Sequence, residues 1–599
     1  MSTPTSVAPA SERSTSHAPQ EIRDHSVSPA KNLFLGQIES TWLFPFPQMS
    51  VTDQETLSMV LESVDRFLED KSADFQNWDN SGAQPPEYIQ SLRELGLFGL
   101  VIPEAYEGIG LSNSAYSRVV QQSSRYDAST SLTIGAHSSI GMKGLLLFGN
   151  DEQKARYLPR LASGELIAAF CLTESGSGSD AGSIRTHAVQ NDDGTWTLDG
   201  EKIWITNGGF ADFFTVFART DGESGKLSAF LVERAFAGVS SGKKEDKMGI
   251  RASATTSVRF DKVRLPAENL LGTPGKGFKI AMAILNNGRT GLGGGCVGGM
   301  KACIELAARQ ADERKQFGQR IAEFGLIKEK IAQMSVDCFA AESVVSMVAG
   351  MIDAGHEDYS VEAAISKVFA TEAMWRAANE ALQVAGGSGY MKELPYERVV
   401  RDSRINMIFE GTNEILRLFI ALSGMKDAGS YLQDVMKGAE NLFNDPIKGF
   451  GLLSEYAGRR LTQLTAVGRD RIVATVVPQL QDEALIFEKY TLEVSRSTDV
   501  LLRRHGKHII GKQFAMQRIA NAVIDLFVGL CVLSRVSLMV RQSEGRDMSQ
   551  PLAIARVFSQ QAKRRMNRNL RRILRNEDDD MKALADFIVA GQGYPWDVL

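Results

Sequence analysis

A change of residue pattern near position 166, and its reversal near position 275, most constrains the fold of this 599-residue chain. Between these positions, stretches such as T-W-T-L-D-G-E-K-I-W-I-T-N-G are rich in β-branched and aromatic residues and bounded by Gly, Asn and Asp, a pattern typical of β-strands. On both sides, apolar residues recur at helical spacing, as in L-S-M-V-L-E-S-V-D-R-F-L-E-D. The sequence therefore predicts a mostly helical α+β protein with an antiparallel β domain in its middle.

These patterns divide the chain into five predicted parts. The first is a tail and N-terminal extension, which we expect to be partly disordered because Ser, Thr, Pro and Ala dominate its first 29 residues. The parts are the extension (1–50), a helical domain (51–165), the β domain (166–275), a helical bundle (276–423) and a further helical domain (424–599).

The composition is that of an ordinary soluble globular protein, with 43% hydrophobic and 23% charged residues. The net charge of −5 gives no general reason to expect nucleic acid as a partner. Five cysteines are scattered singly without metal-site spacing, so no metal is predicted and buried thiols in a reducing compartment are expected. We also expect no membrane span, because the nearest apolar run, 522–533, is short and contains Asp525.

One segment, Val400 to Leu418, carries the strongest candidate for chemistry. Glu410 follows the apolar pair Ile408-Phe409 and precedes Gly411, and a helical pattern begins just beyond, with Thr412 or Asn413 as its N-cap. Glu410 is therefore predicted to lie in a turn among apolar neighbours, where burial raises the pKa of a carboxyl group towards that of a useful base. By itself this segment is better explained by a surface glutamate in a loop.

Five motifs, in one order, give the segment a context. They are F-C-L-T-E-S-G-S-G-S-D (170–180), I-W-I-T-N-G-G (203–209), R-K-Q-F-G (314–318), Q-V-A-G-G-S-G-Y (383–390) and I-F-E-G-T-N-E-I-L-R (408–417). Together they resemble the flavin-binding and base-bearing segments of the acyl-CoA dehydrogenases. The length of the chain and the run L-N-N-G-R (285–289) further resemble the very-long-chain branch, which has an extra C-terminal domain.

The resemblance implies FAD as the cofactor and assigns roles to particular residues. Glu410 would be the catalytic base, and a homodimer would be needed because the segments at 314–318 and 383–390 reach FAD in the neighbouring subunit. The implied cofactor-binding residues are Phe170, Leu172, Thr173, Gly178, Ser179, Trp204, Ile205, Thr206, Arg314, Gln316, Phe317, Gln383, Gly386, Gly387, Thr412 and Asn413. The implied substrate-binding residues are Ser179, Arg289, Phe409 and Gly411.

The implied activity is α,β-dehydrogenation of long-chain acyl-CoA to trans-2-enoyl-CoA in fatty acid β-oxidation, with electron-transferring flavoprotein as the acceptor. Two alternatives stay open: an acyl-CoA oxidase, whose core motifs are nearly the same, and a non-enzymatic assembly or nucleic-acid-binding member of the family. The compartment would be the bacterial cytoplasm, with peripheral contact at the inner membrane face, or the mitochondrial matrix and inner membrane.

Four further features of the sequence lie outside these motifs. Gly293, Gly295 and Gly298 match a dinucleotide-binding pattern, but a helical pattern precedes them, so close helix packing is predicted instead. Six arginines between 564 and 575 recur at helical spacing and are interpreted as a solvated, partly ion-paired face. Residues 449–464 have an amphipathic pattern that fits either core packing or a membrane surface. Gly288, with Asn286 and Asn287, is predicted to leave a deeper acyl pocket.

Overall fold

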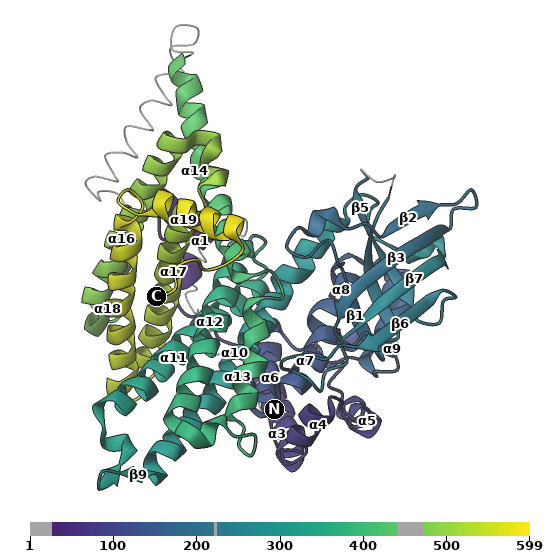
Figure 1. Ribbon diagram of the computed structural model, residues 1–599, viewed down its shortest axis with the longest axis horizontal. Coiled ribbons are helices and arrows are strands. Elements are labelled where there is room, and N and C mark those ends of the chain that lie inside the picture. The colour runs from purple at the N-terminus through teal and green to yellow at the C-terminus, as the bar shows by residue number, and fades with distance from the viewer. Residues whose placement is uncertain (1–26, 221–224, 441–470, 599) are drawn as a thin grey trace, which may run out of the picture.

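The computed structural model describes residues 27–220, 225–440 and 471–598. Figure 1 shows a large helical part beside a smaller part built around a β-sheet, with the sheet on the right. The order of helices, sheet and helices along the chain confirms the predicted α+β organisation. Residues 449–464 lie outside the described residues, so their membrane contact stays a prediction.

The first helices run from residue 29 to residue 162. Several begin at side-chain caps, the clearest being α9, where Asn150 and Gln153 form a reciprocal capping box. The elements are α1 (Pro29–Leu35), α2 (Ser40–Leu43), α3 (Val51–Asp70), α4 (Phe75–Ser81), α5 (Pro86–Glu94), α6 (Asn113–Tyr126), α7 (Ala128–Gly135), the π-helical turn η2 (Ala136–Gly141), α8 (Lys143–Phe148) and α9 (Asp151–Ala162).

The described part of the N-terminal extension packs against the C-terminal helices. Phe34 of α1 and Trp42 of α2 are buried in the hydrophobic core of the C-terminal helices. A Cβ atom added at Gly424 would lie 2.1 Å from the Phe34 ring, so this glycine makes room for α1. Gly424 was taken as the approximate start of the further helical domain, and the helix α14 (Asn413–Glu440) runs through this position. The packing of α1 against α14 is a long-range contact, which a local pattern does not record.

The sheet follows the order β6-β7-β3-β2-β4-β5-β8, with β1 also paired to β4. Most neighbours are antiparallel, as predicted, but β1 pairs with β4 in parallel (Ala168 opposite Phe213), and so does β2 (His187 opposite Arg219). The expectation of a purely antiparallel sheet is therefore corrected to a mixed one. The strands are β1 (Ala168–Cys171), β2 (His187–Gln190), β3 (Trp196–Ile205), β4 (Phe213–Arg219), β5 (Leu227–Glu233), β6 (Val239–Lys244), β7 (Thr256–Leu265) and β8 (Leu270–Leu271).

Strand β4 is covered on both faces, which explains its continuous apolar sequence. Phe213 and Phe217 point into a core shared with α8, α9 and α10, whereas Phe214 and Val216 point into a second core beneath β3 and β7. Because side chains alternate across a strand, one run of aromatic residues fills both cores. The sheet is thereby fixed against the helices that carry the rest of the site.

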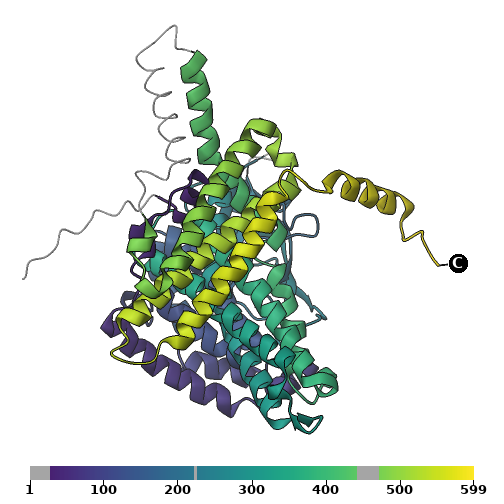
Figure 2. The ribbon, with the colours of Figure 1, turned by 90° about the vertical axis from the view of Figure 1, so that its left-hand side faces the viewer.

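The second helical part begins with a long helix, α10, and ends near the C-terminus. Its helices are α10 (Gly277–Glu313), α11 (Gly325–Asp353), α12 (Ser360–Ala385), α13 (Tyr396–Arg404), α14, α16 (Gln481–His505), α17 (Gln513–Arg541), α18 (Ser549–Arg571) and α19 (Asp578–Gly591), with a hairpin of β9 (Lys315–Gln316) and β10 (Gln319–Arg320) after α10. Figure 2 shows α14 and α19 extending away from the body of the protein.

A buried carboxylate joins the C-terminal helices to the rest. Glu342 on α11 accepts from Arg535 on α17 at 2.7 Å and from Arg118 on α6 at 3.0 Å, and it also pairs with Lys301 on α10. Arg535 and Lys301 outweigh the effect of burial and lower the pKa of Glu342 to about 2. Four helices from three predicted domains are thus tied together by one side chain.

Two helices correct the expectation that no segment is apolar enough for a membrane span. In the part of the chain that the structure describes, α11 and α17 have the length and composition required. However, 72% and 78% of their most apolar windows are buried inside the protein. Asp525 on α17 is itself buried and paired with Arg565 of α18. Both helices therefore act as core helices in this fold.

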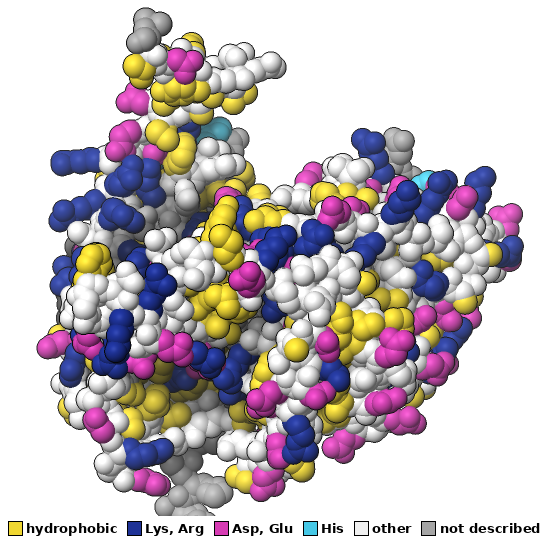
Figure 3. All heavy atoms as spheres, turned by 60° about the horizontal axis from the view of Figure 1, so that its bottom comes forward, with side chains coloured by type: hydrophobic (Ala, Val, Ile, Leu, Met, Phe, Trp, Pro, Cys, Tyr) yellow, Lys and Arg dark blue, Asp and Glu magenta, His cyan; other side chains and the backbone are white. Residues whose placement is uncertain are grey.

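The remaining sequence predictions concern packing and surface charge. The glycines at 293, 295 and 298 lie inside α10, and a Cβ at Gly298 would come within 2.0 Å of the Gln121 carbonyl oxygen on α6, so close helix packing is confirmed. The arginine-rich region is largely exposed, with Arg572 paired to Glu577. On the face drawn in Figure 3, basic and acidic side chains are interspersed.

Candidate active site

Glu410 lies in a tight turn between the short helical turn at 405–407 and α14. Its φ is 58°, a left-handed conformation that is uncommon for a residue with a side chain, and Gly411 follows with φ 92°. Thr412 caps α14 by accepting from the backbone N–H of Ile415 at 3.3 Å. The turn and its cap confirm the local prediction, and the left-handed backbone implies that surrounding contacts hold Glu410 in place.

Two buried cations supply those contacts. The Arg289 Nε–H donates to the carbonyl oxygen of Glu410 at 3.3 Å. The Lys367 ammonium donates to the carbonyl oxygen of Gly411 and to Oδ1 of Asn413, both at 2.8 Å. Lys367 was missed by sequence reasoning. The available signal was a single lysine within the apolar helical run A-A-I-S-K-V-F-A of α12.

A network behind the turn makes this arrangement rigid. The Asn413 side-chain amide donates to Thr371 at 3.1 Å and to Glu372 at 3.2 Å, and Glu372 is held by Arg417 at 2.7 Å. Burial lowers the pKa of Lys367 to about 8, even though nearby carboxylates favour its charge. The turn that carries Glu410 is therefore attached to α12 through a hydrogen-bonded chain of polar side chains.

The carboxyl group of Glu410 has one buried oxygen, Oε2, without a hydrogen-bond partner among the described residues. Burial raises the pKa of Glu410, while the charges of Arg289 and Lys367 act in the opposite direction. Gly288 lies directly alongside, since a Cβ added there would be 3.9 Å from Oε2. A buried carboxylate with a free oxygen and a raised pKa is suited to accept a proton from a bound ligand.

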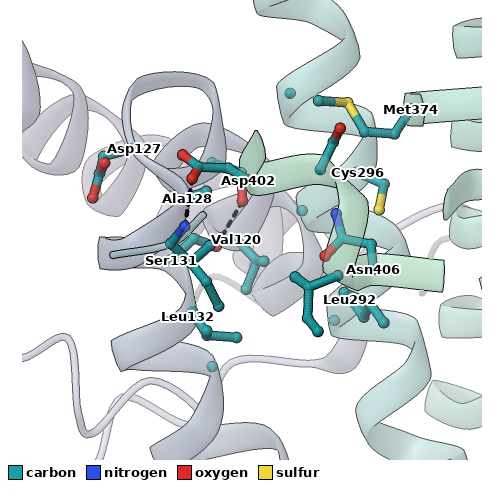
Figure 4. A pocket seen from close by; sticks show the side chains of 18 of the residues that line it. Val120, Asp127, Ala128, Ser131, Leu132, Leu292, Cys296, Met374, Asp402 and Asn406 are labelled. Carbon is teal, nitrogen blue, oxygen red and sulfur yellow. Dashed lines mark hydrogen bonds between the residues drawn. The ribbon is translucent and has the colours of Figure 1, made fainter. Parts of the chain in front are cut away.

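Glu410 opens onto a cavity between α7, α10, α13 and the sheet. Phe409, Gly288 and Thr206 line the same cavity, and Thr206 comes from the end of β3 in the sheet. The residue expected beside the flavin ring and the expected base are therefore brought to one space by segments about 200 positions apart. Figure 4 shows part of this cavity.

The two flavin segments on the sheet are held to each other. Lys202, fully buried on β3, pairs with Glu174 at 2.6 Å and donates to the carbonyl oxygen of Leu172 at 3.1 Å. The Ile203 N–H donates to the Thr173 carbonyl oxygen at 2.9 Å. Trp204 has φ 58° and is 63% exposed, and Gly178 and Ser179 are also exposed. An exposed indole beside an open loop of small residues fits a planar cofactor.

Not every assigned side chain faces that cofactor surface. Ile205 is buried in the sheet core, Leu172 is buried beneath the loop, and Phe170 packs on Phe217 with ring centroids 5.2 Å apart. Asn413 is occupied in the network behind Glu410, and Arg289 binds the Glu410 carbonyl and Asn286. For Asn413 and Arg289 the structure therefore favours a positioning role over ligand contact. Gly411 and Thr412 lie beside the base, in the turn and at its cap.

The hairpin after α10 carries the other set of assigned residues. Phe317 is 94% exposed with φ 53°, and Arg314 and Gln316 are also exposed. At the end of α12, Gln383, Gly386 and Gly387 are exposed as well. Figure 1 places β9 at the lower left and the sheet at the right, so one subunit does not bring the hairpin to its own flavin loops.

Comparisons with known proteins agree with this geometry. The chain matches the acyl-CoA dehydrogenase N-terminal domain (residues 54–165), middle domain (169–263) and C-terminal domain (275–425), and the ACAD9/ACADV C-terminal domain (478–594). It is 45% identical over 543 residues to the very long-chain specific acyl-CoA dehydrogenase, mitochondrial, of Bos taurus, covering 89% of this chain and 82% of the relative.

Solved structures give the same result. An acyl-CoA dehydrogenase complexed with FAD from Bacillus anthracis superposes with a TM-score of 0.77 at 33% identity, covering 91% of both chains. Butyryl-CoA dehydrogenase from Megasphaera elsdenii superposes with a TM-score of 0.60 at 37% identity, covering 63% of this chain and 98% of that one.

The fold and the site define a flavin-dependent dehydrogenase, and this chain belongs to the acyl-CoA dehydrogenase family. Among its relatives, the very-long-chain enzymes share the additional C-terminal domain. The protein is an FAD-dependent oxidoreductase that dehydrogenates acyl-CoA in fatty acid oxidation. Among the described residues, no group of three or more His, Cys, Asp or Glu side chains is placed to hold a metal ion.

Proposed function

We propose that Glu410 removes the α-proton from long-chain acyl-CoA thioesters in this protein. The observation that carries the proposal is the partner-free, buried Oε2 of Glu410 on a cavity that also receives Thr206. When bound, FAD supplies the acceptor for the β-hydride. Arg289 and Lys367 hold the backbone on both sides of the base, so its carboxylate stays aimed into the cavity.

The cavity wall supports long acyl chains. Gly288, Gly291, Gly295 and Gly299 line it from α10, and Ala302 continues the same face. Gly288 and Ala302 are fourteen positions apart, which corresponds to about 21 Å of helix. An extended chain advances about 1.2 Å per bond, so this wall accommodates roughly seventeen bonds. Asn286 and Asn287 do not line the cavity, so the depth comes from the glycine face instead.

A homodimer completes the FAD site in this proposal. The exposed hairpin residues Arg314, Gln316 and Phe317, together with Gln383, Gly386 and Gly387, would contact FAD held by the partner's sheet. Electrons would leave to electron-transferring flavoprotein, and an acyl-CoA oxidase stays the alternative. The described cysteines are all free and buried, which fits a reducing compartment. Relatives occur both as mitochondrial enzymes and in Bacillus subtilis.

An anaerobic titration tests the base and the chain length together. Glu410→Gln should retain FAD and bind acyl-CoA, yet reduce the flavin about 10²–10⁴-fold more slowly than wild type. Glu414→Gln, four residues further on and exposed, is the matched control and should react normally. In wild type, C14 to C18 acyl-CoAs should bleach the flavin faster than C4 to C8. Flavin reduction at the wild-type rate in Glu410→Gln would show that Glu410 is not the base. Rapid reoxidation of the reduced flavin by air would favour the oxidase.

A further inference from the structure

The acyl cavity has two chemically different ends. The residues that line the cavity lead away from Glu410 along three parts of the chain. They run from Gly288 to Ala302 on α10, from Ile140 back to Ala128 on η2 and α7, and from Glu410 back to Arg398 on α13. Contacts fix this order near the base, where a Cβ at Gly288 would meet Ile140 at 2.8 Å. The far end is therefore where α7, α10 and α13 converge, farthest from Glu410.

Charged and hydroxyl groups line that far end. Asp127, Ser131, Arg398 and Asp402 all border the cavity, and each is more than nine-tenths buried. Nη1 of Arg398 is buried without a hydrogen-bond partner among the described residues. Figure 4 shows Asp127, Ser131 and Asp402 on one side of the cavity and Leu292 and Cys296 on the other. A hydrocarbon terminus would satisfy none of these groups.

The two carboxyl groups are only partly satisfied by the protein. Oδ2 of Asp127 accepts from the Thr130 N–H at 2.7 Å and from the Thr130 hydroxyl at 2.9 Å, and among the described residues Asp402 accepts only from the Ile250 N–H, through Oδ1. Burial raises the pKa of Asp127 and raises that of Asp402 to about 7, and Arg398 opposes both effects.

The other charged groups nearby are accounted for. Asp79 also faces the two carboxyl groups, but it is paired with Arg401 at 2.8 Å. Arg125, at the end of α6, is paired with Glu305 at 2.9 Å. Lys247 also faces Asp402, but its ammonium donates to the Ser253 carbonyl oxygen at 2.8 Å. Arg398 faces both carboxyl groups, and its Nη1 has no partner among the described residues.

We propose that this far end binds a terminal hydroxyl group, so that the protein accepts long ω-hydroxyacyl-CoA substrates as well as unsubstituted ones. A hydroxyl group both donates and accepts, which matches a carboxyl group beside a guanidinium. A terminal carboxylate is disfavoured because Asp127 and Asp402 are already present. The wall of about 21 Å from Gly288 to Ala302 sets the chain length at which the hydroxyl reaches the end of the cavity, near C18. This inference rests on the proposed function.

The test compares matched substrates on the holoenzyme by anaerobic flavin reduction. Relative to octadecanoyl-CoA, 18-hydroxyoctadecanoyl-CoA should have an equal or higher kcat/KM. Relative to decanoyl-CoA, 10-hydroxydecanoyl-CoA should be at least tenfold poorer, because its hydroxyl loses water beside Gly295 and does not reach the end of the wall at Ala302. Each ratio is measured on the same protein, so the fraction of active enzyme cancels. Failure of octadecanoyl-CoA itself would refute the proposed function and not this inference.

Substitutions test which residues bind the terminal hydroxyl group. The C18 ratio is kcat/KM for the hydroxylated C18 substrate divided by kcat/KM for the unsubstituted one, and the C10 ratio is defined in the same way. Arg398→Met should lower the C18 ratio at least fivefold and leave the C10 ratio unchanged. Ser131→Ala, which removes a hydroxyl bonded to Ser124 at 2.6 Å, serves if Arg398→Met does not fold, and should lower the same ratio by a smaller factor. Ser139→Ala, near the base, should leave the C18 ratio unchanged. An equal penalty for the hydroxyl at C10 and C18, or a better reaction with the mono-CoA ester of octadecanedioic acid, would overturn the proposal.

Discussion

Replacing Lys367 with methionine tests whether the catalytic turn depends on the buried cation beneath it. Methionine keeps an unbranched side chain of similar length but removes both hydrogen bonds, to the Gly411 carbonyl oxygen and to Asn413. It also removes one of the two positive charges that lower the pKa of Glu410. The variant therefore affects the position and the basicity of the base without touching its side chain.

The effect on stability should be small, because two contributions of similar size oppose each other. Two hydrogen bonds from a charged donor contribute about 3–6 kcal/mol. Against this, lowering the pKa of Lys367 from 10.5 to about 8 corresponds to roughly 3 kcal/mol of burial cost at neutral pH. That cost disappears as pH rises from 8 towards 10.5, because the unfolded chain then releases the proton too.

Activity should respond much more strongly. A displacement of about 1 Å in a catalytic group costs about 10²-fold in rate, so we expect flavin reduction to slow by about that factor. Because a positive neighbour is lost, the pKa of Glu410 rises, and the acid limb of the rate–pH profile should move to higher pH.

The assay is stopped-flow flavin reduction per bound FAD across pH 5–9, with octadecanoyl-CoA. Lys301→Met is the matched control, since it removes a lysine that pairs with Glu342 away from the turn; it should lower stability and leave the acid limb in place. If Lys367→Met reacts at the wild-type rate with an unmoved acid limb, Lys367 does not position or tune the base.

Three other substitutions give independent predictions. Glu342→Gln should lower the free energy of unfolding by up to about 3 kcal/mol above pH 4.5, because the pKa of Glu342 in the folded protein is lowered to about 2. In wild type this stabilisation is lost as the pH falls from 4.5 through 2. Denaturation measured across that pH range tests both statements. Arg314→Ala should lose FAD while staying folded, whereas Arg320→Ala in the same hairpin should keep FAD. Gel filtration with detection of flavin absorbance measures both. Full retention of FAD by Arg314→Ala would contradict the cross-subunit site. Gly298→Ala should lose about 1–3 kcal/mol in urea denaturation, because its Cβ would overlap a backbone carbonyl of α6.

The catalytic turn illustrates how far local pattern extends. The sequence around Glu410 predicted a turn, a cap and an apolar setting, and all three are present, because each depends on residues within about ten positions. The partners that hold the turn come from α10 and α12, and only tertiary packing brings Arg289 and Lys367 to its carbonyl oxygens. The side chain of Asn413 is likewise oriented by its neighbours across the bundle, which the local sequence does not reveal.

Periodicity and motif order in the sequence determined the succession of helices, sheet and helices and the family, and they indicate the base and the cofactor loop that we propose. These follow from short-range backbone preferences and from residue types that chemistry requires together. The tertiary structure decided what lies outside that range. It placed α1 in the C-terminal core, paired β1 with β4 in parallel, carried α14 through Gly424 and gave the acyl cavity a polar far end. Each of these depends on contacts between segments tens to hundreds of residues apart, whose free energies are set by shape and burial in the folded chain.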